Sequence, residues 1–113
     1  MTLRVAIIGG GIGGLSAALA LLREGFDVHV YEQASRFGEI GAGIQISPNA
    51  SRLLYRYGLA AAMDRYAVRP RAVHQKRWDD ARTLQRAVLG PEVEARFGAP
   101  YFHFHRGDLA ALL

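Results

Sequence analysis

A cluster of glycines near the start of the chain restricts its fold more than any other feature of the sequence. Gly9, Gly11 and Gly14 form the pattern Gly-x-Gly-x-x-Gly directly after an apolar run at residues 5–8. A continuous apolar run is typical of a strand that is buried on both faces of a parallel sheet. A strand that leads into glycines at this spacing predicts a dinucleotide-binding turn, provided that a helix follows.

Each of the three glycines has its own role in such a turn. Gly9 permits the tight turn out of the strand, and Gly11 lets the backbone approach a pyrophosphate because it has no side chain. Gly14 allows the following helix to pack closely on the sheet. The free N–H groups and the positive dipole end of that helix are then expected to hold the phosphates.

The residues after the glycines complete a strand–helix–strand unit. Residues 15–23 are rich in Ala and Leu, which favour a helix, and Gly25 stands where this helix is expected to end. Residues 28–31 then predict a second strand, which ends at Glu32. A carboxylate at this position can accept hydrogen bonds from both hydroxyls of a ribose. It also argues against a 2′-phosphate at the site, because two negative charges would repel each other.

The middle of the chain predicts a loop and two further helices. Residues 36–47 contain three glycines and are expected to form a loop with a short extended piece. Ser47 offers a hydroxyl cap and Pro48 a favourable first helical position, and Gly58 is expected to end the helix that they begin. Residues 60–66 predict a second, short helix. The apolar face of the first of these helices is predicted to consist of Ala50, Leu53, Leu54 and Tyr57.

The last third of the chain mixes extended and helical segments. Residues 72–89 predict a pair of strands that turns near residues 79–80, and residues 91–97 predict a helical turn. Residues 101–105 are rich in residues that favour a strand, and Asp108 is expected to cap a final helix. The fold class that we predict is therefore α/β: the N-terminal part of a Rossmann-like domain with a small β excursion.

Composition excludes several classes of protein. The 113 residues carry a net charge of +4 and include no cysteine, so disulfides and thiolate metal sites are excluded. The positive residues are scattered, whereas a nucleic-acid binder would gather them on one face with aromatic residues. No apolar run approaches the roughly 18–20 residues that span a bilayer, so no membrane partner is expected. The lack of cysteine favours a cytoplasmic protein by default. His103 and His105 have no third ligand nearby in the sequence, so no metal site is expected.

Four blocks of sequence carry a more specific signal than the glycine pattern alone. They are residues 5–14 (VAIIGGGIGG), Glu32-Gln33, residues 38–50 (GEIGAGIQISPNA) and residues 98–109 (GAPYFHFHRGDL). Together they resemble the FAD-dependent aromatic hydroxylases, the flavoprotein monooxygenases that act on salicylate, 3-hydroxybenzoate and 6-hydroxynicotinate. The resemblance extends over almost the whole chain, and the later blocks are far more specific than the first.

This resemblance implies a cofactor, a substrate class and a set of site residues. It implies FAD as cofactor, NADH or NADPH as co-substrate, and O2 and a small aromatic acid as the other reactants. Residues 41–45 would pass beside the flavin, with Gln45 near the substrate, where a glutamine favours the hydroxybenzoate-type members. No residue is indicated as a catalytic acid or base. With the glycine pattern, the resemblance gives as cofactor-binding residues Gly9, Gly11, Ile12, Gly13, Gly14, Glu32, Gln33, Gly43, Ile44 and Arg106.

The chain is expected to be only part of such an enzyme. Residues 1–113 would form the N-terminal portion of an FAD-binding domain, without a complete second domain, because the family's later flavin-binding motifs are missing from the sequence. Two alternatives remain open. One is another FAD oxidoreductase with a similar opening, such as an amine oxidase or a ubiquinone-pathway hydroxylase. The other is a non-catalytic nucleotide-binding fragment, which would purify without flavin.

Overall fold

The computed structural model describes residues 3–35 and 42–113, which divide into two compact units. The first unit comprises Met1–Gly43 and His105–Leu113, and the second comprises Ile44–Phe104. Gly38 and Gly41, which belong to the block at residues 38–50, lie outside the described residues.

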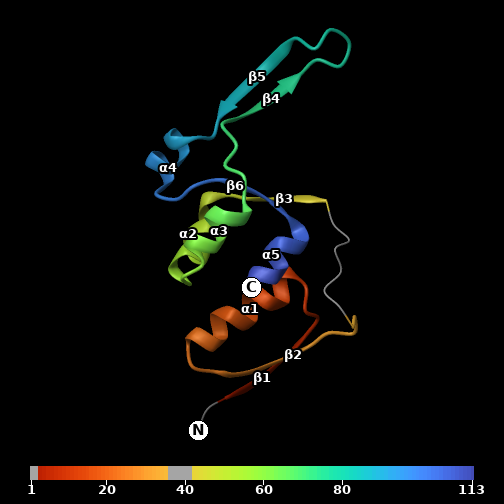
Figure 1. Ribbon diagram of the computed structural model, residues 1–113, viewed down its shortest axis with the longest axis vertical. Coiled ribbons are helices and arrows are strands. Elements are labelled where there is room, and N and C mark those ends of the chain that lie inside the picture. Colours follow the sequence, from red (N-terminus) through yellow and green to blue (C-terminus); the bar gives the residue numbers. More distant parts are fainter. Residues whose placement is uncertain (1–2, 36–41) are drawn as a thin grey trace. The chain divides into compact units, whose positions relative to one another are not determined.

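The first unit contains the predicted strand–helix–strand arrangement. Strand β1 (Arg4–Ile8) leads through the glycine turn into helix α1 (Ile12–Arg23), and strand β2 (Asp27–Tyr31) follows. The two strands pair in parallel, and α1 lies along one face of the pair (Figure 1). The prediction is confirmed, although α1 begins three residues earlier than the Ala- and Leu-rich segment indicated, within the glycine pattern itself.

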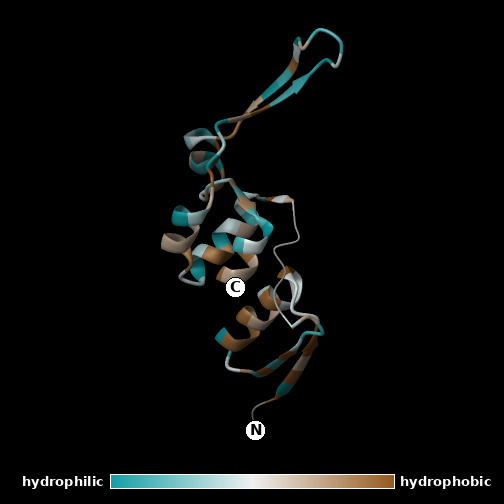
Figure 2. Ribbon diagram, turned by 45° about the vertical axis from the view of Figure 1, so that its right-hand side comes forward, coloured by the Kyte–Doolittle hydropathy of each residue, from teal (hydrophilic) through white to brown (hydrophobic). Residues whose placement is uncertain are grey.

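Strand β1 is less buried than its apolar sequence predicts. Its residues alternate between exposed and half-buried, and the side chain of Ile8 is 82% exposed. The prediction of burial on both faces is therefore wrong for the described part of the chain, because α1 covers only one face of the strand pair. Figure 2 shows the hydrophobic colour that β1 and α1 share.

Helix α5 (Arg106–Leu112) completes the first unit by lying against α1. Among the described residues of this unit, Ala18 of α1 and Leu109 of α5 are buried and apolar, with exposed fractions of 6% and 1%. Asp108 was expected to cap this helix, and that prediction is wrong. The helix begins at Arg106 with His105 in the cap position, so the Asp108 carboxylate lies in the first turn. There it stabilises the positive end of the helix dipole instead of closing a cap.

The second unit consists of short elements around an aromatic core. Strand β3 pairs with β6, and the hairpin of β4 and β5 extends away from the helices of this unit (Figure 1). This hairpin is antiparallel, and it confirms the predicted strand pair. The elements are β3 (Gly43–Ile46), α2 (Pro48–Arg56), α3 (Ala60–Tyr66), β4 (Ala72–Lys76), β5 (Thr83–Val88), α4 (Pro91–Phe97) and β6 (Phe102–His105).

Alternation along β6 separates a buried face from a more polar one. Phe102 and Phe104 are 0% and 3% exposed, and their ring centroids lie 5.9 Å apart in an edge-to-face arrangement. Met63 from α3, also fully buried, contributes to the same core. Tyr101 and His103, at the alternate positions, are only half-buried. The period of two that is typical of strands therefore places two polar side chains opposite the core.

Helix α2 buries most of the face that was predicted, with Leu54 8% exposed and Ala50 and Tyr57 half-buried. The prediction is wrong for Leu53, which is 43% exposed, and it missed Ser51.

Ser51 is fully buried, and its hydroxyl donates a hydrogen bond of 2.6 Å to the carbonyl oxygen of Pro100. Ser47 occupies the cap position as predicted, but its hydroxyl makes no cap hydrogen bond. It donates instead to the side-chain oxygen of Asn49 at 2.5 Å.

Candidate nucleotide-binding site

The turn between β1 and α1 has a geometry that only glycine accommodates at two positions. Gly9 has a φ of +103°, a value that residues with side chains rarely adopt, and its N–H donates to the carbonyl of Tyr31 at 2.7 Å. At Gly14, a Cβ atom would lie 1.9 Å from the carbonyl oxygen of Gly9. The predicted roles of Gly9 in the turn and of Gly14 in close packing agree with this geometry.

The other glycines of the pattern face open space. Apart from its chain neighbours and the nearby backbone of its own helix, a Cβ at Gly11 or at Gly13 would meet no atom of the described chain within 4 Å. Gly11 is exposed, with extended backbone, and occupies the cap position of α1. Packing among the described residues therefore does not require glycine at either position.

Glu32 joins the end of β2 to the glycine turn. One carboxylate oxygen accepts a hydrogen bond of 2.6 Å from the N–H of Gly10, and the other accepts one of 2.8 Å from the N–H of Ala34. These backbone donors, with Ala34 contributing most, lower the pKa of Glu32 below its usual value. The carboxylate is thus ionised at neutral pH. Because a carboxylate offers about four acceptor positions, it keeps positions free for the hydroxyls of a ribose.

The remaining predicted cofactor residues are divided between the two units. Gln33 is exposed directly after Glu32, and Ile12 is the first residue of α1. Arg106 is the exposed first residue of α5, in the same unit as the glycine turn. Gly43 also belongs to the first unit, whereas Ile44 and Gln45 belong to the second.

Sequence reasoning missed three residues that contact the predicted ones. Gly10 and Ala34 supply the backbone N–H groups that bind Glu32, and Tyr101 donates its hydroxyl hydrogen to Oε1 of Gln45 at 2.7 Å. The two backbone donors could not be identified from the sequence, because every residue except proline has a backbone N–H group. Tyr101 could have been found from the alternation at residues 101–105, which sets its side chain on the face opposite Phe102.

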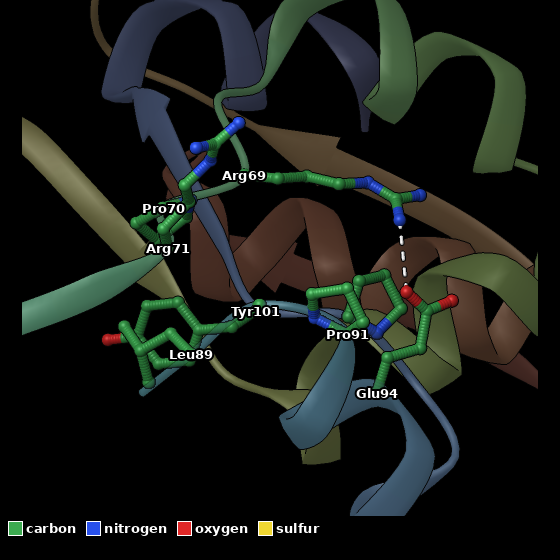
Figure 3. Close-up of a pocket in the computed structure, with 9 residues that line it drawn as sticks. Arg69, Pro70, Arg71, Leu89, Pro91, Glu94 and Tyr101 are labelled. Carbon is green, nitrogen blue, oxygen red and sulfur yellow. Dashed lines mark hydrogen bonds and ion pairs between the residues drawn. The ribbon is translucent and has the colours of Figure 1, made fainter. Parts of the chain in front are cut away.

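A hollow of about 190 Å³ lies within the second unit (Figure 3). At its rim the guanidinium of Arg69 bonds to Glu94 at 3.0 Å and to Asp64 at 2.7 Å. The hydrogen bond from Arg69 lowers the pKa of Asp64, and the same bond raises the pKa of Arg69. Two carboxylates therefore already neutralise this arginine. It includes none of the predicted cofactor residues, and its lining consists of Arg69, Pro70, Arg71, Leu89, Gly90, Pro91, Glu94, Pro100 and Tyr101.

Within residues 3–35 and 42–113, no three His, Asp or Glu side chains gather in a way that could hold a metal ion. None of the helices in the same ranges has both the length and the apolar character needed to cross a membrane.

A protein-family model matches the first part of the chain. The model of the NAD(P)-binding Rossmann-like domain family matches residues 7–67, which is more than half of the chain. The matched segment includes the glycine turn and Glu32. The α/β fold class and its Rossmann-like character are thereby confirmed.

Curated relatives confirm the resemblance to aromatic monooxygenases. The chain is 51% identical over 106 residues to a 3-amino-4-hydroxybenzoate 2-monooxygenase of Streptomyces platensis, covering 94% of this chain and 27% of the relative. It is 41% identical over 110 residues to a 6-hydroxynicotinate 3-monooxygenase of Pseudomonas fluorescens, covering 97% of this chain and 29% of the relative. The chain therefore spans little more than a quarter of the length of these proteins.

A solved structure gives the same result for the fold. The HpxO protein of Klebsiella pneumoniae, crystallised with FAD and uric acid, superimposes with a TM-score of 0.82 at 28% identity. The similarity covers 96% of this chain and 27% of that protein. On the match over residues 7–67, the chain belongs to the NAD(P)-binding Rossmann-like domain family.

Proposed function

We propose that this chain is the FAD-binding N-terminal part of a flavin-dependent monooxygenase. The full-length enzyme would hydroxylate a small aromatic acid of the hydroxybenzoate class, with O2 and with NADH or NADPH as co-substrates. It would act in the cytoplasm, without a nucleic-acid or membrane partner. The similarity to two aromatic monooxygenases and to a protein crystallised with FAD supports this assignment over a nicotinamide dehydrogenase.

The observation that carries the proposal is the glycine turn closed by Glu32. Close packing at Gly14, where an added Cβ would lie 1.9 Å from the carbonyl oxygen of Gly9, and the hydrogen bond from Gly10 to Glu32 hold the turn next to an ionised carboxylate. Gly11 leaves space beside the start of α1, where N–H groups without a partner inside the helix can bind phosphate oxygens. These features fit the pyrophosphate and the adenosine ribose of FAD.

The residues of this chain would bind and orient the cofactor. When bound, FAD would supply the redox chemistry: hydride would come from NADH or NADPH, one oxygen atom of O2 would enter the aromatic ring, and the other would leave as water. The N–H groups of Ile12, Gly13 and Gly14 would hold the pyrophosphate, and Glu32 the ribose hydroxyls. Arg106 would bind a phosphate or ribose oxygen, because its planar guanidinium can form two parallel hydrogen bonds.

The roles of the other predicted residues rest on the family resemblance. Gln33 would contact the adenosine part of FAD, and Gly43 and Ile44 would pass beside the flavin ring. Gln45 would lie next to the substrate.

The test compares two acid-to-amide variants of the full-length protein. Glu32→Gln removes the negative charge that would bind the ribose, and it should weaken FAD binding about ten- to hundredfold. Glu24→Gln is the matched control, because Glu24 is an exposed acid at the opposite end of α1. Its FAD affinity should equal that of the parent. Both are measured by titrating refolded apoprotein with FAD.

Three outcomes would contradict the proposal. Equal FAD affinity of Glu32→Gln and the parent would remove Glu32 from the site. A full-length protein that purifies without flavin would favour a non-catalytic nucleotide-binding module. A flavoprotein that oxidises an amine, and whose NAD(P)H oxidation no aromatic acid stimulates, would be a different FAD oxidoreductase.

A further inference from the structure

A hydrogen bond in the second unit joins Gln45 to a residue that the glycine pattern does not involve. The hydroxyl of Tyr101 donates to Oε1 of Gln45 at 2.7 Å, across 56 positions of sequence. Pairing of β3 with β6 brings the two residues together. Gln45 is exposed and Tyr101 is half-buried, so the bond lies where a ligand can reach it.

The ring of Tyr101 has neighbours that fix its position. The ring of His103 meets it at an interplanar angle of 67°, with 5.7 Å between centroids. Leu89 and Pro91 line the hollow that Tyr101 also lines (Figure 3). The next residue, Phe102, is anchored in the core with no exposed surface. A tyrosine has only two side-chain torsions, so a ring held in this way fixes where its hydroxyl points.

The direction of this hydrogen bond determines what Gln45 can offer to a ligand. A glutamine side chain has one carbonyl oxygen that accepts and one NH2 group that donates. Because Oε1 accepts from Tyr101, the NH2 group is left to face other partners. A fixed pair of N–H donors is suited to an oxygen atom that only accepts, such as a carboxylate or a phenolate oxygen.

We propose that Tyr101 is a positioning residue, which orients the Gln45 carboxamide so that its N–H groups donate to an oxygen of the aromatic acid. This inference rests on the proposed function, which puts Gln45 next to the substrate. Free glutamine side chains sample many rotamers, and ordering one costs free energy. Tyr101 removes much of that cost before the substrate arrives, so substrate affinity should depend on a hydroxyl that need not contact the substrate.

The hydrogen bond itself is tested in the 113-residue chain by nuclear magnetic resonance. Tyr101→Phe keeps the ring and removes only the hydroxyl. It should move the side-chain amide resonances of Gln45 toward the values of a free glutamine. The control is Tyr66→Phe, which removes the hydroxyl of an exposed tyrosine on α3 and should leave these resonances in place. Unchanged Gln45 resonances in Tyr101→Phe would overturn the proposal.

The effect on substrate binding is tested in the full-length enzyme by a double-mutant cycle. The substrate is the aromatic acid that best stimulates NADH or NADPH oxidation, from a panel that includes 3-amino-4-hydroxybenzoate and 6-hydroxynicotinate. Tyr101→Phe should raise KM about three- to tenfold and change kcat less than about twofold. In a Gln45→Ala background the same substitution should have no further effect, because Tyr101 acts through Gln45. Additive effects would overturn the positioning role.

A third variant tests which atoms of Gln45 face the substrate. Gln45→Glu keeps an acceptor for Tyr101 but replaces the N–H donors by a negative charge. It should therefore raise KM more than Gln45→Ala does, while unchanged binding would overturn the proposed donor role. FAD affinity should not change in any of these variants. If the enzyme binds FAD and hydroxylates an aromatic acid but Tyr101→Phe keeps the parent KM, only this inference fails. If no aromatic acid stimulates turnover, the proposed function fails and this inference with it.

Discussion

Gly13 and Gly14 are adjacent in the first turn of α1, yet they stand in opposite surroundings. A Cβ at Gly13 would meet open space, whereas a Cβ at Gly14 would lie 1.9 Å from the backbone oxygen of Gly9. Gly14→Ala should therefore lower the free energy of unfolding by about 1–3 kcal/mol, since the glycine turn has to shift. Gly13→Ala should raise it by up to about 1 kcal/mol, because alanine favours a helix more than glycine does.

The two alanine variants are compared by urea unfolding, followed by circular dichroism. The parent chain and both variants are measured under the same conditions. Equal stabilities for Gly13→Ala and Gly14→Ala would contradict the close approach of α1 to the end of β1.

Arg106 is one of the predicted cofactor-binding residues. It is exposed and begins α5, in the same unit as the glycine turn. In the full-length protein, Arg106→Ala should weaken FAD binding about ten- to hundredfold. Arg106→Lys should restore only part of this loss, because lysine keeps the charge but not the two parallel donors. Arg56→Ala, in the last turn of α2, is the control.

FAD titration of refolded apoprotein measures these effects, with circular dichroism to verify folding. Folded Arg106→Ala with the affinity of the parent would make this arginine an ordinary surface charge. Full rescue by lysine would mean that charge alone is recognised.

At the scale of the elements, the buried hydroxyl of Ser51 in α2 forms a hydrogen bond with Pro100, in the segment before β6. Ser51→Ala would leave the carbonyl of Pro100 without its partner and should cost about 1–3 kcal/mol of unfolding free energy. Ser47→Ala should cost less than about 0.5 kcal/mol, because Ser47 makes no cap hydrogen bond. Thermal or urea unfolding distinguishes the two serines. A larger loss for Ser47→Ala would restore the capping role that the sequence predicts.

Most elements could be predicted because their signals are local. Glycines end α1 and α2 with φ values of +83° at Gly25 and Gly58, and the period of two at residues 101–105 predicts β6. The glycine turn could also be predicted, since its strand, spacing and helix lie within about twenty residues. Long-range contacts could not. Ser51 looks like a surface residue until Pro100, 49 positions away, accepts its hydrogen bond.

In the candidate site, too, local features could be predicted and long-range contacts could not. Glu32 could be identified from its place at the end of β2, but its hydrogen bonds to Gly10 and Ala34 depend on backbone geometry alone. The link between Tyr101 and Gln45 depends on the pairing of β3 with β6, which no local pattern encodes. The sequence predicted that β1 is buried on both faces. This was wrong, because the burial of a strand depends on which elements cover the sheet, and α1 covers only one face.

At the scale of the whole molecule, the chain spans 27% of the length of its Streptomyces platensis relative. We expect the 113-residue chain by itself to bind FAD weakly and to lack hydroxylase activity. The flavin ring would be open to water, which catalysis of this kind has to exclude. The check is whether aromatic acids stimulate the oxidation of NADH or NADPH by the purified chain. Stimulated oxidation would show that these residues suffice for turnover.

The exposed end of the β1–β2 pair has a consequence for the behaviour of the chain in solution. Ile8 and Tyr31, side by side at that end, are 82% and 58% exposed, whereas Arg4 and Asp27 form an ion pair at the other end. The unpaired backbone groups at the edge of a strand pair are templates for pairing between molecules, and charged side chains oppose such pairing. Mutual repulsion from the net charge of +4 also opposes aggregation. Added salt screens this repulsion, so the chain should remain dispersed at low ionic strength and associate as salt is raised.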